Sequence, residues 1–303
     1  MSKGRAGRLH IVYLRRVLPF RATECVLGPL GLLLVGAREP GTRIVRRTAT
    51  GFCEIPIPFQ PTRHRPAALG EGGAFRVVGR DGELVTVLAD GTTTRETVEY
   101  AGVLAGIEGD IVVGVGPKFF ELEGGSFVDV TPPPVSTGDT DFTNLADNTK
   151  LVTAIAGGPR PAVFVKGGVY SRTAKGWIER AVPDARIVAA AASAKGTVYG
   201  ASERDLFRVD GKGVTVRAHG LEGARIRSLA VGIEALLIGT DRGLFGFRDR
   251  VGTPIRLPRA GAVPDVACYG DVEVGIQEGL PFARRYDDGE FSEWEMINIP
   301  VPK

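Results

Sequence analysis

The sequence has few of the residues that build most disulfide scaffolds and metal centres. Its 303 residues include only 3 cysteines, 3 histidines, 2 tryptophans and 2 methionines. Cys25, Cys53 and Cys268 are far apart and odd in number, and no C-x-x-C spacing occurs. This pattern argues against a disulfide scaffold or a cysteine zinc site and favours small buried thiols in a reducing compartment. No histidine has a second histidine at ligand spacing, so we expect neither a metal nor a cofactor.

The usual signatures of enzymes are also missing. No G-x-S-x-G sequence is present, and the glycine-rich GEGG at 70–73 lacks the lysine and the Ser/Thr of a phosphate-binding loop. Asp139, Asp141 and Asp147 carry possible calcium ligands, but their spacing does not match the D-x-[DN]-x-[DN]-G loop. We therefore expect no catalytic residue and predict that the protein is not an enzyme.

Neither one sign of charge nor a long apolar run dominates the chain. The formal net charge is +3, with basic and acidic residues interspersed, which by itself does not indicate nucleic-acid binding. The longest apolar stretch, residues 26–37 (VLGPLGLLLVGA), is too short to cross a bilayer. It also coincides with the repeat described next. With no clear targeting segment, we expect a cytoplasmic protein.

Seven times an apolar residue is followed by glycine, or once by lysine, then by a polar turn and a second β-rich run. The second residues of these pairs are separated by steps of 43, 35, 52, 34, 39 and 36 residues, and they are Gly36, Gly79, Gly114, Lys166, Gly200, Gly239 and Gly275. A period near 40 made of short strands is typical of a β-propeller with about four strands per blade. The sequence therefore predicts an all-β protein, a single seven-bladed propeller of antiparallel strands.

Two segments fall outside this repeat. Residues 1–20 form an N-terminal extension with a strand-like stretch at 10–14, and residues 131–148 (TPPPVSTGDTDFTNLADN) form an insertion that explains the 52-residue step. The propeller is expected to occupy 21–303. Because residues 291–299 can supply the outer strand of the last blade, we expect residues 8–18 to lie outside the blades, where they add to a sheet edge or bind a partner.

The sixth repeat carries a family resemblance. In residues 226–247, IRSLAVGIEALLIGTDRGLFGF, a run of Leu, Leu, Ile, Gly and Thr at 236–240 precedes Gly243 and Leu244. This stretch resembles the repeat of two-component-regulator propellers, bacterial sensor proteins, although Leu237 replaces the usual tryptophan. The fifth repeat (VYGASERDLF) matches more loosely. The resemblance implies a propeller of bacterial type. The chain shows neither the kinase nor the membrane segment of those sensors.

One set of residues is a candidate binding site. The turn between the second and third strands holds a basic residue in six repeats, and Glu278 takes the place in the seventh. The six are Arg38, Arg80, Lys118, Lys166, Arg204 and Arg242. Equivalent turns lie on one face of a propeller, so a ring of basic groups would concentrate positive potential there.

Three functions remain open on this basis. The first is a non-enzymatic scaffold that docks protein partners in a bacterial multi-subunit assembly. The second is an enzyme or binder at the mouth of the central channel that uses the basic ring for a small anionic ligand. The third is nucleic-acid association, which a low aromatic content of 7% disfavours.

Overall fold

The computed structural model describes residues 21–131 and 152–298, apart from short gaps. Those gaps are 30, 39–40, 49–50, 58, 63–64, 89, 99–103, 115–117, 124–125, 157–160, 174–175, 183–185, 194, 204, 211–212, 218–220, 222 and 249–250. The predictions for residues 8–18, and for nearly all of the insertion at 131–148, therefore lie outside the described residues.

The first four blades each take four strands in chain order. Blade 1 consists of β1 (Arg21–Gly28), β2 (Gly31–Arg38), β3 (Gly41–Thr48) and β4 (Gly51–Pro56). Blade 2 consists of β5 (Ala67–Leu69), β6 (Phe75–Val78), β7 (Glu83–Val87) and β8 (Thr93–Thr97). Blade 3 consists of β9 (Leu104–Glu108), β10 (Ile111–Gly114), β11 (Lys118–Glu123) and β12 (Ser126–Asp129). Blade 4 consists of β13 (Val152–Ala156), β14 (Ala162–Val165), β15 (Gly168–Thr173) and β16 (Gly176–Ala181).

The last three blades repeat this plan. Blade 5 consists of β17 (Ala189–Ala192), β18 (Val198–Ala201), β19 (Leu206–Asp210) and β20 (Gly213–Arg217). Blade 6 consists of β21 (Ile226–Val231), β22 (Leu236–Thr240), β23 (Leu244–Arg248) and β24 (Val251–Ile255). Blade 7 consists of β25 (Asp265–Tyr269), β26 (Val272–Gln277), β27 (Leu280–Asp287), β28 (Glu290–Phe291) and β29 (Glu295–Met296).

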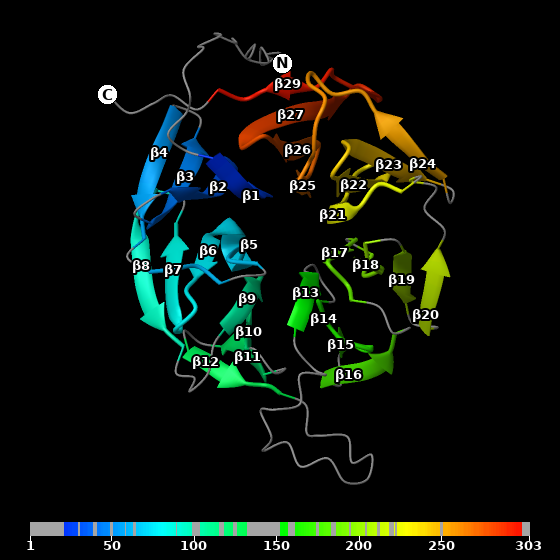
Figure 1. Cartoon of the computed structure of the whole chain (residues 1–303). Helices are drawn as coiled ribbons and strands as arrows, with labels where there is room; N and C mark the ends of the chain where they lie inside the picture. The colour runs from blue at the N-terminus through cyan, green and yellow to red at the C-terminus, as the bar shows by residue number, and fades with distance from the viewer. Residues whose placement is uncertain are drawn as a thin grey trace, which may run out of the picture.

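The seven sheets form a ring around a common axis (Figure 1). Within each blade the strands pair antiparallel in sequence order, except that β29 of blade 7 pairs with β27. The first strands surround the centre, and they are β1, β5, β9, β13, β17, β21 and β25. The only helical element of the described residues is a single 3-10 turn, η1 (Glu71–Gly73). The predicted seven-bladed propeller is confirmed. No helix in the described part of the chain has the length and apolar character needed to cross a membrane.

The hydrophobic core lies between neighbouring blades. Between blades 4 and 5, Phe164, Ile187 and Phe207 are at most 1% exposed and pack in one cluster. Burying one such side chain contributes about 1.5–3 kcal/mol. This packing also explains a repeat glycine, because a Cβ on Gly200 would come within 2.7 Å of Phe164 Cζ.

We predict that Gly200→Ala lowers the free energy of unfolding by about 1–3 kcal/mol, since the added methyl group overpacks this inter-blade core. Urea unfolding would measure the loss. Gly246→Ala is the matched control, because its new Cβ would meet its nearest neighbour at an ordinary 3.5 Å. Equal effects at the two positions would contradict the packing explanation.

The first strands of several blades share a bulge near their start. The register shifts between Ala22 and Glu24 in β1, and equivalent shifts leave Thr153 of β13 and Arg227 of β21 as the extra residues. In β1 and β13 the bulged threonine hydroxyl donates to a carbonyl of the second strand, Thr23 to Val35 O at 3.2 Å and Thr153 to Phe164 O at 3.3 Å. A bulge redirects a side chain out of the ladder.

Two predictions about details need correction. The outer strand of blade 7 is not continuous over 291–299: β28 and β29 both pair with β27, and the three residues 292–294 lie opposite two residues of β27. Trp294 turns inward there and packs edge-on against Phe282 at 5.0 Å between ring centroids, so side-chain burial interrupts the ladder. The expectation of buried thiols is wrong for Cys53, which is exposed.

Candidate functional site

Alternating antiparallel strands bring two kinds of connection to one face of the ring. One kind is the turn between the second and third strands of a blade, and the other is the linker between neighbouring blades. We call the face that carries both kinds of connection the linker face. Backbone hydrogen bonds join the two kinds of connection directly. Val263 N donates to Thr240 O at 2.7 Å, and Asp241 N donates to Arg225 O at 3.1 Å.

The predicted basic residues do not all occupy equivalent places in these turns. Arg80, Lys166 and Arg242 lie within turns and are exposed. Lys118 is also exposed but is the first residue of β11. Arg38 is the last residue of β2, and its side chain, like the whole of residue 204, lies outside the described part. Their common binding role stays a prediction.

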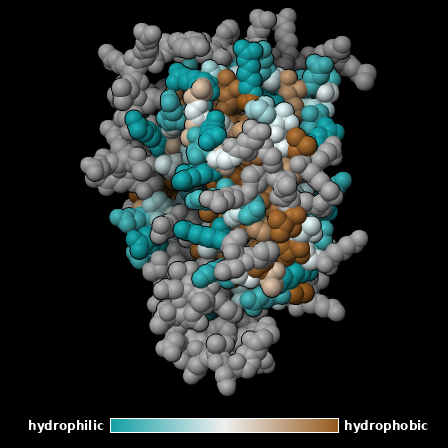
Figure 2. Space-filling model, turned by 45° about the vertical axis from the view of Figure 1, so that its right-hand side comes forward, coloured by the Kyte–Doolittle hydropathy of each residue, from teal (hydrophilic) through white to brown (hydrophobic). Residues whose placement is uncertain are grey.

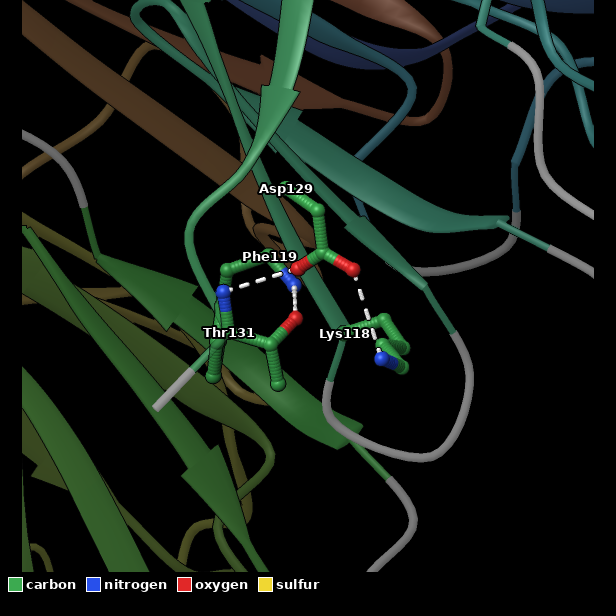
Figure 3. A network of polar contacts seen from close by, with 4 residues as sticks. All are labelled: Lys118, Phe119, Asp129 and Thr131. Atoms are coloured by element: carbon green, nitrogen blue, oxygen red, sulfur yellow. Dashed lines mark hydrogen bonds and ion pairs between the residues drawn. The ribbon is translucent and has the colours of Figure 1, made fainter. Parts of the chain in front are cut away.

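Lys118 belongs to a polar network at the end of blade 3 (Figure 3). Its Nζ lies 3.3 Å from Asp129 Oδ2, while Thr131 N donates to Asp129 Oδ1 at 2.9 Å. Thr131 Oγ1 in turn accepts a hydrogen bond from Phe119 N at 3.1 Å. Burial alone would raise the pKa of Asp129, but the hydrogen bonds from Thr131 and the ion pair with Lys118 hold it below its ordinary value. Lys118 is thus partly neutralised, which weakens it as a member of a basic ring.

The structure brings together a second set of residues that the sequence did not reveal. Asp265 begins β25 and accepts a hydrogen bond on Oδ2 from Cys25 N of β1, at 2.7 Å. Glu24, just after the bulge of β1, interacts electrostatically with both Asp265 and Arg65. Arg65 lies in the linker before blade 2, where its carbonyl accepts a hydrogen bond from Ile107 N at 2.8 Å. The inner edges of blades 7, 1 and 2 therefore place two carboxyl groups and a guanidinium group close together.

This arrangement raises the pKa of both carboxyl groups. Burial raises the pKa of Asp265 from 3.8 to about 6, although Arg65 and the hydrogen bonds from Cys25 act in the opposite direction. Burial and the nearby Asp265 raise the pKa of Glu24 well above its ordinary value. Burial likewise raises the pKa of the Cys25 thiol, so this sulfur is not an activated nucleophile.

A further buried charge pair lies inside blade 7. The Arg284 guanidinium contacts Glu273 Oε2 at 2.7 Å, and the Glu273 side chain is only 3% exposed. The guanidinium carbon also lies 3.7 Å from the Phe291 ring centroid and 4.6 Å from that of Trp294. The Glu273 carboxylate also accepts a hydrogen bond from the backbone of Ile233 in blade 6, so we assign the pair a structural role between blades 6 and 7.

The described residues hold no ready metal site. They include no group of three His, Cys, Asp or Glu side chains that could bind an ion, while all three histidines lie in stretches that the structure does not describe. Exposed large hydrophobic residues such as Ile178, Val216 and Val251 lie on different outer strands. In Figure 2 the hydrophobic residues of the forward side appear in several small areas with hydrophilic side chains between them.

Comparison with known proteins identifies the fold and not a family. No family model and no curated protein matches the sequence. Among solved structures, the one described as YCF48 bound to D1 peptide superposes with a TM-score of 0.64 at 9% identity, covering 89% of this chain and 93% of the other. The β-propeller domain of Cps50 (Swd1) from Myceliophteria thermophila gives 0.64 at 12% identity, covering 91% and 100%.

An enzyme is also among the structural neighbours. Virginiamycin B lyase from Staphylococcus aureus superposes with a TM-score of 0.63 at 11% identity, covering 86% of this chain and 92% of the other. Identities this low show a shared propeller architecture alone, because one fold hosts many functions. The resemblance to two-component-regulator repeats has no matching family model behind it.

Proposed function

We propose that this chain is a non-enzymatic propeller that docks protein partners through its linker face. The observation that carries the proposal is the exposure of Arg80, Lys166 and Arg242 in second-to-third-strand turns of three different blades. Exposed loops on a rigid scaffold are where binding usually resides, and arginine and lysine there suit acidic partners. A solved propeller of the same architecture is bound to a peptide. The proposal extends to a cytoplasmic multi-subunit assembly of a bacterium.

The second candidate function is an enzyme or binder of a small anionic ligand near the ring axis. Glu24, Asp265 and Arg65 favour it, because burial raises the pKa of both carboxyl groups, and a carboxyl group with a raised pKa can act as an acid or a base near neutral pH. A guanidinium group beside them could hold an anion. A thermal shift on adding anionic metabolites, abolished by Arg65→Gln and unaffected by charge reversal in the turns, would favour this candidate over protein docking.

We predict that Arg80→Glu, Lys166→Glu and Arg242→Glu together abolish partner capture in affinity purification from the native cells. Each exposed contact contributes less than about 1 kcal/mol, so single substitutions are expected to have small effects and the triple change a large one. The melting temperature should change little, because all three side chains are exposed. Stoichiometric partners would be identified by mass spectrometry.

The matched control reverses three exposed charges away from these turns, with Arg95→Glu, Lys195→Glu and Arg285→Glu. Arg95 lies on the outer strand β8, Lys195 in the turn after β17, and Arg285 in an exposed pair with Asp271. The control should keep the partner. Full capture by the turn variant, or equal loss in both variants, would overturn the linker face as the docking surface.

A further inference from the structure

Hydrogen bonds between a turn and its linkers organise the linker face around blade 6. Its second-to-third-strand turn contacts the linkers on both sides: Arg225 N donates to Asp241 Oδ1 at 2.9 Å, and Val263 N donates to Thr240 O at 2.7 Å. The linker to blade 7 is fixed as well, because Gln277 Nε2 donates to Arg259 O at 2.9 Å. The backbones of residues 225, 241 and 259 are therefore held in one hydrogen-bonded surface.

Arginine side chains are concentrated on this surface. Arg225 and Arg259 project from the two linkers, Arg242 from the turn between them, and Arg227 from the bulge of β21, and all four are exposed. In the part of the chain that the structure describes, no carboxylate lies within ion-pair distance of Arg225, Arg227 or Arg259. We call the four residues the blade-six arginine group.

Exposed arginines on a fixed backbone, of which Arg225, Arg227 and Arg259 form no ion pair with a described carboxylate, are suited to bind anions. The guanidinium group offers a planar fork of donors that matches a carboxylate in two parallel hydrogen bonds. The one carboxylate of the turn, Asp241, already accepts a hydrogen bond from Arg225 N, so it is directed at the backbone. The bulge that carries Arg227 places a fourth guanidinium group toward the inner edge of the same face.

We propose that the blade-six arginine group docks an acidic protein segment, one with several Asp or Glu side chains in succession. This inference rests on the proposed docking function and names the chemistry of the partner. It also moves the centre of the docking surface from a ring of turns around the axis to one sector, to which the linkers contribute more residues than the turns do.

A nucleic acid fits this surface less well. Single-stranded nucleic acids require aromatic side chains on which bases stack, and the one exposed large aromatic residue that the structure describes, Tyr269, ends β25 at the opposite face. Carboxylates also interrupt the positive charge, since Glu203 and Glu278 are exposed in the turns of the adjacent blades 5 and 7. A continuous phosphate backbone would be repelled by them, whereas a peptide can place its carboxylates between them.

The test uses the full chain and a labelled acidic peptide of about twelve residues that contains several glutamates in succession. Binding is measured by fluorescence anisotropy at low and moderate salt. Arg225→Gln, Arg227→Gln and Arg259→Gln together should weaken binding by about tenfold or more, since three exposed ion pairs are lost. The matched variant Arg95→Gln, Lys195→Gln and Arg285→Gln removes the same charge away from the second-to-third-strand turns and the linkers. It should weaken binding by no more than about twofold. A glutamine version of the peptide should not bind.

Each outcome decides the proposal. Equal weakening by both triple variants, or tighter binding of an oligothymidine of the same length than of the acidic peptide, would overturn it. The same variants would also be tested on the partner captured from native cells. Capture unaffected by the three blade-six substitutions would defeat this inference and leave the docking function standing. Failure to capture any protein would instead count against the docking function, whatever the peptide shows.

Discussion

Replacing Asp265 with asparagine is expected to stabilise the protein at about pH 7.5 relative to the wild type, and to give no such gain at about pH 4. The carboxyl group sits where the ring closes, on blade 7 and hydrogen-bonded to the backbone of blade 1 at Cys25. Burial raises its pKa from 3.8 to about 6 in the folded protein. Ionising it therefore costs more free energy in the folded state than in the unfolded chain.

The direction of this change in stability with pH follows from the coupling between folding and proton binding. A group whose pKa is higher in the folded state contributes stability that is fully present below about pH 4 and is lost as the pH rises through about 6. The full difference corresponds to about 3 kcal/mol. Because the side chain is only partly shielded from water, we expect the advantage of Asp265→Asn over the wild type to grow by about 2 kcal/mol between pH 4 and pH 7.5. Urea unfolding across this range measures it.

Two further variants make the result specific. Asp81→Asn is the control, because it removes one carboxyl group from an exposed turn after β6. Asp265→Asn should gain stability over this control as the pH rises. Glu24→Gln combined with Asp265→Asn should flatten the profile further, because the pKa of Glu24 is raised in the same direction. A difference between Asp265→Asn and the wild type that stays constant with pH would refute the assignment.

The sequence predicts the fold well because each blade repeats the same packing contacts and turns. The anchor glycines recur since neighbouring groups press on them: a Cβ on Gly239 would come within 2.4 Å of Ser228 Oγ, and one on Gly275 within 2.4 Å of Phe282 Cζ. Such contacts arise within a repeat or between adjacent repeats, so they leave a period in the sequence. The seven blades and their four-stranded order follow from that period.

The site could not be predicted in the same way. Glu24 and Asp265 are at opposite ends of the propeller sequence and meet only because the ring closes. The arginines at 225 and 259 lie in linkers of irregular sequence, where a hydrogen bond to Asp241 of the blade-six turn fixes Arg225 and one from Gln277 of blade 7 fixes Arg259. An alignment of second-to-third-strand turns could find Arg242 but not these residues. The interruption of the last outer strand could not be predicted either, because it depends on the packing of Trp294 against Phe282 of β27 and not on the local sequence pattern.

Breaking the buried ion pair of blade 7 is the change we expect to destabilise the protein most. Arg284→Met should lower the free energy of unfolding at about pH 7 by about 3–5 kcal/mol, because it leaves the Glu273 carboxylate buried without its partner. Burial raises the pKa of Glu273 while Arg284 lowers it, so removing the guanidinium group raises that pKa further. The loss should therefore shrink as the pH falls and Glu273 takes up a proton.

The matching change on the other side should cost less. The Arg284 side chain is 15% exposed and its guanidinium group contacts the Phe291 and Trp294 rings, so we expect Glu273→Gln to cost about 1–2 kcal/mol. The double variant Glu273→Gln, Arg284→Met should be more stable than Arg284→Met alone, because no uncompensated charge remains buried. Chemical unfolding of the four proteins gives the coupling between the two positions.

If Arg284→Met does not fold, recovery of soluble protein in the double variant provides the same test. A double variant no better than Arg284→Met would show that the arginine acts through its packing on the aromatic rings rather than through its charge.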